Sequence, residues 1–230
     1  VSSNSPDFAI GDVAMSLGAW EQYTTAPAAG LNKLDESAGI PLSLFLGALG
    51  PTGLTAYFGL LDVGRPKAGE TVLVSAAAGA VGSVVGQIAK MQGCRVVGMA
   101  GTDDKCRWLT DELGFDAAIN YKTCGDYVAA IKQACPEGVD VYFDNVGGEI
   151  LDATLICLNK FARVAVCGWI STYNVKNAPG PTNLWQLVAE SVTIQGFTVL
   201  DYMDRFGEGI GQLAQWLMEG KLKFETDVVR

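Results

Sequence analysis

The stretch TVLVSAAAGAVGSVVG, at residues 71–86, decides the fold. Four residues that suit a buried strand run directly into small residues, and a helical pattern follows from about Ala80 to Gln92. Aligned on the pattern G-x-G-x-x-G, the turn has Ala77 in the first place and Gly79 and Gly82 in the other two. Small residues at these places permit a tight turn and let backbone N–H groups approach a pyrophosphate at the start of a helix.

A second interpretation of this turn is that its small residues serve only the packing of a helix against a strand. The pattern lies between a strand and a helix, at the start of an array of β-α units, and this position favours nucleotide binding. The sequence therefore predicts a dinucleotide site, and its cofactor-binding residues at this turn are Ala78, Gly79, Ala80, Val81 and Gly82.

Further along the chain, apolar runs alternate with helical patterns in the same way. The patterns predict strands at residues 95–100, 117–121, 140–143, 162–166 and 193–197, and helices at about residues 104–113, 127–135 and 149–158. The apolar runs are continuous rather than alternating, which is typical of a parallel sheet buried on both faces. The predicted fold class is therefore α/β, a Rossmann doubly wound parallel sheet with right-handed crossovers.

The two ends of the chain have a different, antiparallel β character. The first end contains a turn that enters a strand at residues 6–13 and a short strand at residues 18–23, and the other end contains a lone strand at residues 223–229. Each piece is too short to form a closed domain. We expect a partial β-rich catalytic domain at residues 1–50, a nucleotide-binding domain at residues 51–220, and a strand that starts to return to the first domain at residues 221–230.

Composition excludes several classes of function. A formal net charge of −9 and the absence of a basic stripe argue against a nucleic-acid partner. No apolar run is long enough to span a bilayer, and the first residues do not resemble a signal peptide. The six cysteines form no C-x-x-C pair, which predicts reduced thiols in a cytoplasmic protein. The chain contains no histidine, so a histidine base, a histidine triad and a histidine zinc site are all excluded.

The choice of nicotinamide cofactor depends on the end of the second predicted strand. A site for NAD usually has Asp or Glu there to hold the ribose 2′-hydroxyl, whereas this chain has Ala100 and Gly101. Lys105 follows at the start of the next helix, where a cation could meet a 2′-phosphate, although Lys105 could also be an ordinary solvated residue. Asp103 is an alternative candidate, an acidic residue that could hold the ribose hydroxyl of NAD. On balance these residues favour NADPH.

Several motifs in order carry a family resemblance. They are LTAYFGL at residues 54–60, AAAGAVG at 76–82, DNVGG at 144–148, and Cys167-Gly168 followed by ISTYN at 170–174. Together they resemble the zinc-free medium-chain dehydrogenase/reductases, and within them the branch of prostaglandin reductases and alkenal double-bond reductases. The resemblance extends from about Pro6 to Val229. The members of this family are longer at both ends, with a GroES-like catalytic domain of which residues 1–50 would be a remnant.

This resemblance implies NADPH-dependent reduction of the C=C bond of an α,β-unsaturated ketone or aldehyde, without metal, in a homodimer. It implies that Lys105 and Tyr121 hold the 2′-phosphate, that Asn145, Cys167 and Gly168 line the cofactor cleft, and that the backbone of Phe197 and Val199 meets the nicotinamide carboxamide. A further departure, Gly50-Pro51-Thr52-Gly53 in place of Gly-Met-Pro-Gly, could alter the cleft near Thr52.

The expected reaction needs one donor beside the substrate. Hydride transfer to the β-carbon places negative charge on the carbonyl oxygen, and a hydrogen-bond donor aimed at that oxygen lowers the barrier. Tyr173 is the predicted catalytic residue, since no histidine is present; the alternative is that Tyr173 only packs on the ribose. Two other functions stay open, namely an NADPH-dependent quinone oxidoreductase and a non-catalytic NADPH-binding sensor.

Overall fold

The computed structural model describes residues 4–16, 18, 21–34 and 39–226. The chain divides into two compact units, Val1–Leu44 and Phe45–Arg230. In the first unit, β1 (Ala14–Met15) and β2 (Asn32–Lys33) pair antiparallel, and a short η1 (Ala28–Gly30) lies between them. An ion pair joins Lys33 to Asp12 at 2.5 Å.

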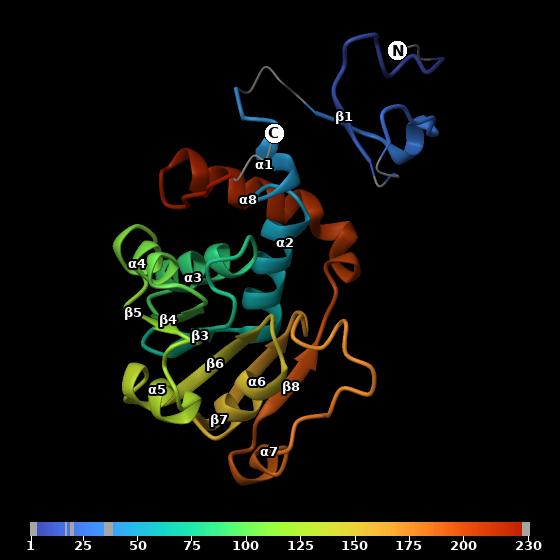
Figure 1. The fold of residues 1–230 in the computed structure, drawn as a ribbon. Helices are drawn as coiled ribbons and strands as arrows, with labels where there is room; N and C mark the ends of the chain where they lie inside the picture. Colours follow the sequence, from blue (N-terminus) through green and yellow to red (C-terminus); the bar gives the residue numbers. More distant parts are fainter. Residues whose placement is uncertain (1–3, 17, 19–20, 35–38, 227–230) are drawn as a thin grey trace. The chain divides into compact units, whose positions relative to one another are not determined.

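The second unit is built on a six-stranded parallel sheet (Figure 1). Its strands are β3 (Thr71–Val74), β4 (Arg95–Ala100), β5 (Ala117–Asn120), β6 (Val139–Asp144), β7 (Leu158–Val166) and β8 (Thr193–Gly196), in the order β5-β4-β3-β6-β7-β8. The chain winds outward from β3 in one direction and from β6 in the other, so the strand order reverses between these two central strands. This arrangement confirms the predicted Rossmann sheet.

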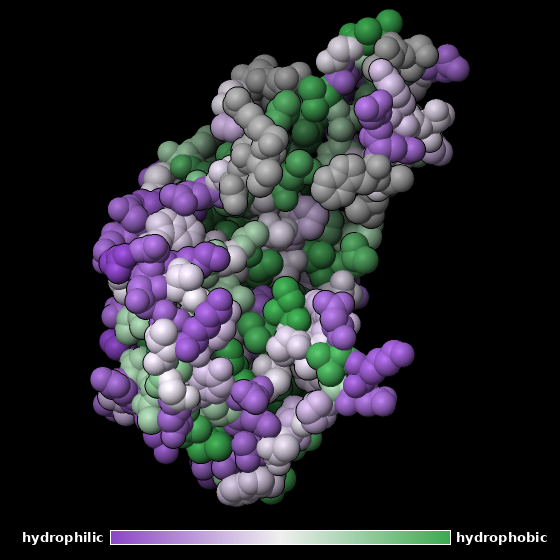
Figure 2. Space-filling model, in the orientation of Figure 1, coloured by the Kyte–Doolittle hydropathy of each residue, from purple (hydrophilic) through white to green (hydrophobic). Residues whose placement is uncertain are grey.

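Helices cover both faces of this sheet. On one face, α5 (Tyr127–Ala134) and α6 (Gly148–Leu155) bury Ile131 and Leu151 against Tyr142 of β6 and its neighbours. On the other lie α2 (Pro51–Phe58), the π-helical η3 (Gly59–Gly64), α3 (Gly82–Met91) and α4 (Asp103–Asp111). The fold also contains α1 (Ser43–Leu46), α7 (Gln186–Ala189), η4 (Val199–Arg205) and α8 (Phe206–Met218). Hydrophilic side chains gather over α4 and α5, at the left of the view in Figure 2.

Most of the predicted elements are present with slightly different ends. The helix predicted to reach Leu158 stops at Leu155, because a turn at Thr154 and Cys157 lets β7 begin at Leu158 beside Val139. The strand predicted to include Tyr121 ends at Asn120.

The predictions for the chain ends were partly wrong. Within residues 6–13 the structure has turns, and the strand begins only at Ala14. Of the strand predicted at 18–23, the described residues 18 and 21–23 are not in a strand and lie in the connection between β1 and β2; residues 19 and 20 lie outside the described part.

The last predicted strand is also replaced by a different interaction. Residues 223–226 are not in a strand, and residues 227–229 lie outside the described part of the chain. The side chain of Gln87, which is buried in α3, takes both backbone groups of Lys223: the N–H of Lys223 donates to Oε1 at 2.7 Å and Nε2 donates to the carbonyl at 3.0 Å. A side chain thus satisfies the backbone groups that a neighbouring strand would otherwise bind.

The close approach of α3 to the end of β3 gives a prediction for stability. A Cβ at Gly82 would lie 2.5 Å from the carbonyl oxygen of Ala76 and 2.7 Å from the Cα of Ala77. We therefore expect Gly82→Ala to lower the free energy of unfolding by about 2 kcal/mol, since backbone atoms have to shift. Gly211→Ala, on the exposed side of α8 with open space around it, is the matched control and should stabilise slightly. Urea denaturation measures both, and equal effects would contradict the steric argument.

Candidate functional site: a cavity at the carboxyl ends of the central strands

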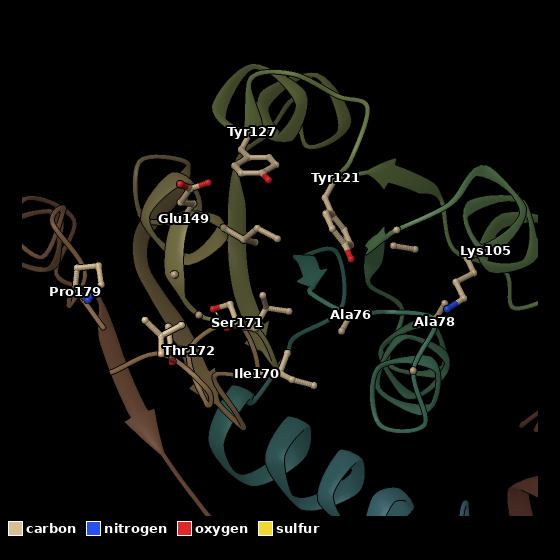
Figure 3. A pocket seen from close by; sticks show the side chains of 18 residues that line it. Ala76, Ala78, Lys105, Tyr121, Tyr127, Glu149, Ile170, Ser171, Thr172 and Pro179 are labelled. Atoms are coloured by element: carbon tan, nitrogen blue, oxygen red, sulfur yellow. Dashed lines mark hydrogen bonds between the residues drawn. The ribbon is translucent and has the colours of Figure 1, made fainter. Parts of the chain in front are cut away.

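A cavity of about 680 Å³ opens where the strand order reverses, beyond the carboxyl ends of β3 and β6. Open α/β sheets bind their ligands at this place. Its walls come from the segments that follow β3, β4, β5, β6 and β7 (Figure 3). The lining residues are Ala76, Ala78, Gly79, Ala100, Gly101, Lys105, Tyr121, Tyr127, Val146, Gly147, Gly148, Glu149, Ile150, Ile170, Ser171, Thr172, Val175 and Pro179.

The glycine-containing turn forms the wall beside α3. Ala78 and Gly79 line the cavity, whereas Ala80, Val81 and Gly82 do not. The helix begins at Gly82 without a side-chain cap. The N–H groups of Ser83 and Val84 already donate to the carbonyls of Gly79 and Val81, at 3.0 and 3.1 Å, whereas the N–H of Gly82 has no hydrogen bond to a described residue. A turn of small residues beside a helix start without a side-chain cap suits a pyrophosphate.

Lys105 and Tyr121 line the cavity beyond β4 and β5. Lys105 lies in the first turn of α4, and it forms no ion pair with any residue that the structure describes. Tyr121 points into the cavity in Figure 3. A Cβ at Gly101 would lie 2.8 Å from the Tyr121 hydroxyl, so an acid at the strand end would compete with Tyr121 for space. This wall therefore offers a free cation and a hydroxyl, which suit a phosphate.

A buried hydrogen-bond network, which sequence reasoning missed, holds part of the cavity wall in place. Asp144, fully buried at the end of β6, accepts four hydrogen bonds at Oδ1: from the hydroxyls of Tyr142 at 2.8 Å and Ser75 at 3.2 Å, and from the N–H groups of Val146 at 3.0 Å and Gly147 at 2.9 Å. Oδ2 of Asp144 has no partner among the described residues. Burial raises the pKa of Asp144 and holds the pKa of Tyr142 well above its usual range. The network fixes Val146 and Gly147, which line the cavity.

Asn145, Cys167 and Gly168 join the ends of the neighbouring strands but do not line the cavity. The Asn145 N–H donates to the Ser75 hydroxyl at 2.8 Å, and Nδ2 of Asn145 donates to the Ser75 carbonyl at 2.7 Å. The N–H groups of Cys167 and Gly168 both donate to the Asp144 carbonyl, at 2.8 and 3.1 Å. Burial raises the pKa of Cys167 to about 11, so its thiol is protonated at neutral pH and is a poor nucleophile.

Tyr173 lies in the loop after β7, between two residues that do line the cavity, Thr172 and Val175. Its hydroxyl accepts a hydrogen bond from the Trp169 N–H at 3.2 Å, and the residue is 67% exposed. Ser171 attaches this loop to the cavity wall, because its hydroxyl donates to the carbonyl of Val146 at 2.6 Å. Tyr173 itself does not line the cavity, but it is exposed and adjoins lining residues in the same loop.

Phe197 and Val199 follow β8 and lie outside the cavity lining. The Phe197 ring packs on Gly59, where a Cβ would lie 2.1 Å from it, and meets Phe143 edge-on at 6.1 Å between ring centroids. Val199 begins η4. In this structure the side chain of Phe197 has a packing role.

The cavity also contains residues that were not predicted as site residues. Ile170, Ser171 and Thr172 belong to a motif that supported the family resemblance, and their position after a predicted strand was the available signal. Tyr127 and Glu149 come from the starts of α5 and α6, and no sequence pattern singled them out. Within the described residues, no three histidine, cysteine, aspartate or glutamate side chains form a group that could hold a metal ion.

The described helices include none that is long and apolar enough to cross a membrane.

Comparison with known families matches residues 80–215 to the family described as zinc-binding dehydrogenase. The match lies within the second unit and contains β4 to β8 of the sheet.

Curated relatives are similar along nearly the whole chain. A Bacillus subtilis protein with the provisional name NADP-dependent oxidoreductase YfmJ is 55% identical over 221 residues, covering 95% of this chain and 65% of the relative. NADPH-dependent curcumin reductase of Escherichia coli is 43% identical, covering 99% and 67%. The NADP(+)-dependent 2-alkenal reductase of Nicotiana tabacum is 43% identical, covering 99% and 66%. The chain thus spans about two thirds of the length of these relatives.

Solved structures of NADPH-bound oxidoreductases are similar in fold to this chain. CurA from Vibrio vulnificus, in complex with NADPH, matches with a TM-score of 0.75 and 45% identity, over 80% of this chain and 56% of that one. The Escherichia coli quinone oxidoreductase complexed with NADPH matches with a TM-score of 0.72 and 25% identity, over 87% and 60%.

Proposed function

Because this chain belongs to the reductase branch of the medium-chain dehydrogenase/reductase family, we propose that it binds NADPH and reduces the C=C bond of α,β-unsaturated ketones and aldehydes. The observation that carries the proposal is the cavity at the strand-order reversal, which has a turn of small residues at one wall and at another Lys105, a cation without an ion pair to any described residue. Reductases are favoured over quinone oxidoreductases because the curcumin and alkenal reductases are 43% identical to this chain, against 25% for the quinone enzyme.

The wall residues fit the parts of this cofactor. Ala78 and Gly79, with Ala80 and Val81 leading into the helix start at Gly82, would hold the pyrophosphate. Lys105 and Tyr121 would hold the 2′-phosphate, a role that the fit of Tyr121 against Gly101 supports. The remaining proposed contacts are Asn145, Cys167 and Gly168 along the cleft and the backbone of Phe197 and Val199 at the nicotinamide end.

When bound, NADPH supplies a hydride for the β-carbon of the conjugated carbonyl compound. The part of this chain is to stabilise the negative charge that then develops on the carbonyl oxygen, and Tyr173 is the proposed donor. Its hydroxyl oxygen already accepts the Trp169 N–H, and no described residue accepts the Tyr173 proton, so that proton is free for a substrate oxygen. A donor aimed at developing charge lowers the barrier more than one aimed at the ground state.

We propose that the reaction is independent of zinc, since the chain has no histidine and its described cysteines and carboxylates do not form a ligand cluster. A cytoplasmic location fits its six free cysteines. The proposed domain organisation keeps residues 1–50 as part of a catalytic domain, 51–220 as the nucleotide-binding domain and 221–230 as the return segment. A homodimer would form by pairing of β8, which within the described sheet is hydrogen-bonded only to β7.

A panel of substrates tests the proposed activity. The chain is mixed with NADPH and with enals, enones or quinones, and the loss of NADPH absorbance is followed. We expect turnover of enals and enones. Turnover of quinones alone would favour a quinone oxidoreductase, and tight NADPH binding without any turnover would favour a sensor.

Removal of the Lys105 cation tests the cofactor assignment separately. We expect Lys105→Ala to weaken NADPH binding by about 1.5–3 kcal/mol, the value of a hydrogen bond to a charged group, and to leave NADH binding nearly unchanged. Lys122→Ala removes an exposed lysine that does not line the cavity and serves as the control. Titration of nucleotide fluorescence measures the dissociation constants, and an equal loss for both nucleotides would refute the assignment.

A further inference from the structure

A carboxylate lies close in sequence to the proposed phosphate site. Asp103 is the first residue of α4, two residues before Lys105, and it is exposed. Its neighbour Asp104 forms an ion pair with Arg107, whereas Asp103 has no ion pair with any described residue. An unneutralised carboxylate here would repel a 2′-phosphate and could accept a hydrogen bond from the 2′-hydroxyl of NADH.

One side chain holds this carboxylate. Nδ2 of Asn120 donates a hydrogen bond to Oδ1 of Asp103 at 2.6 Å. Asn120 is the last residue of β5 and pairs in register with Ala100, the last residue of β4, so its amide lies beside the turn that leads into α4. The opposite end of the amide is fixed as well, because Oδ1 of Asn120 accepts the N–H of Lys122 at 3.1 Å.

The cavity lining includes the positive charge of Lys105 but not the negative charge of Asp103. Ala100, Gly101, Lys105 and Tyr121 line the cavity, but Asp103 does not, although it lies between two of them in the sequence. The helix start therefore presents its lysine to the cavity while its first carboxylate is bonded to the neighbouring strand end.

From this arrangement we infer that Asn120 is a specificity-determining residue, which favours NADPH over NADH by holding the Asp103 carboxylate out of the phosphate site. The inference rests on the proposed NADPH site and names a residue that acts on it indirectly. Asn120 is a positioning residue, since it does not line the cavity itself. Its effect must therefore pass through Asp103, and this dependence can be tested.

The test measures the ratio of the NADH and NADPH dissociation constants by fluorescence titration of the whole chain. We expect Asn120→Ala to lower the preference for NADPH about fivefold, since a freed carboxylate repels the phosphate through partly screened solvent. The double variant Asp103→Asn/Asn120→Ala should recover the wild-type ratio, because the freed side chain is then neutral. Asn159→Ala is the matched control, as its Nδ2 holds Asp140 in the same way, at 2.8 Å, away from the cavity.

Asp103→Asn alone gives a second test, at an exposed position. Because the wild-type carboxylate is already held away, we expect this variant to change the ratio less than about twofold. A large gain in NADPH preference would overturn the inference, since the carboxylate would then already face the cofactor. An unchanged ratio in Asn120→Ala, or no recovery in the double variant, would also overturn it. If the wild-type chain binds neither nucleotide or prefers NADH, the proposed function fails together with the inference; a wild-type preference for NADPH with no effect of Asn120→Ala overturns the inference alone.

Discussion

Turnover of an enone is expected to fall by about 100- to 1,000-fold in Tyr173→Phe, the loss seen when one donor to a developing oxyanion is removed. The affinity for NADPH should stay nearly unchanged, because the phenyl ring keeps whatever packing the tyrosine ring makes. The structure leaves the Tyr173 proton free, since the hydroxyl accepts the Trp169 N–H and has no acceptor among the described residues. Single-turnover absorbance measurements and a nucleotide titration separate the two quantities.

The alternative role of Tyr173 predicts the opposite result. A tyrosine that only packs on the ribose would lose little turnover as phenylalanine, and Tyr173→Ala would then weaken NADPH binding without a specific loss of rate. Tyr202→Phe is the matched control, because the Tyr202 ring stacks on Phe58 at 4.6 Å and Tyr202 does not line the cavity. Unchanged turnover in Tyr173→Phe would refute its role as donor.

The sheet could be predicted from sequence because its central strands are buried on both faces. All four residues of β3 are buried, and five of the six in β6, so these strands show as runs of mostly apolar residues. The ends of the chain lacked that signal. β1 and β2 have two residues each, and their pairing depends on a partner that no local pattern reveals. The return segment is fixed by the side chain of Gln87, an interaction between residues 136 positions apart.

The candidate site was predictable where it depends on local motifs. Ala78 and Gly79 belong to the glycine-containing turn, Lys105 follows the second predicted strand, and Tyr121 was implied by the family resemblance; all four line one cavity. The remaining predicted contacts lie beside the cavity and stay predictions. Interactions between distant segments were missed, because Ser75 and Asp144 are 69 residues apart and only the pairing of β3 with β6 brings them together.

The Asp144 network gives the largest expected effect on stability. We expect Asp144→Ala to lower the free energy of unfolding by about 4 kcal/mol, since it leaves two hydroxyls and two backbone N–H groups without their buried acceptor. Asp144→Asn is the control variant: it keeps an oxygen at the Oδ1 position, so its loss should be less than half as large. Urea denaturation at pH 7 measures both, and equal losses would show that Oδ1 is not the important atom.

The pH dependence of the stability of the same variants tests whether ionisation of the buried Asp144 carboxyl destabilises the native state. Burial raises the pKa of Asp144 above its ordinary value of 3.8, so the native state favours the protonated form. The part of the stability that comes from this pKa shift is therefore fully present below pH 3.8 and is lost as the pH rises through the raised pKa, whereas the four hydrogen bonds to Oδ1 remain. Asp144→Asn cannot ionise, so its disadvantage relative to wild type should shrink as the pH rises from 4 to 7. A disadvantage that grows instead would mean that the carboxylate is stabilised as an anion by its four donors, and that these hydrogen bonds outweigh the cost of burial.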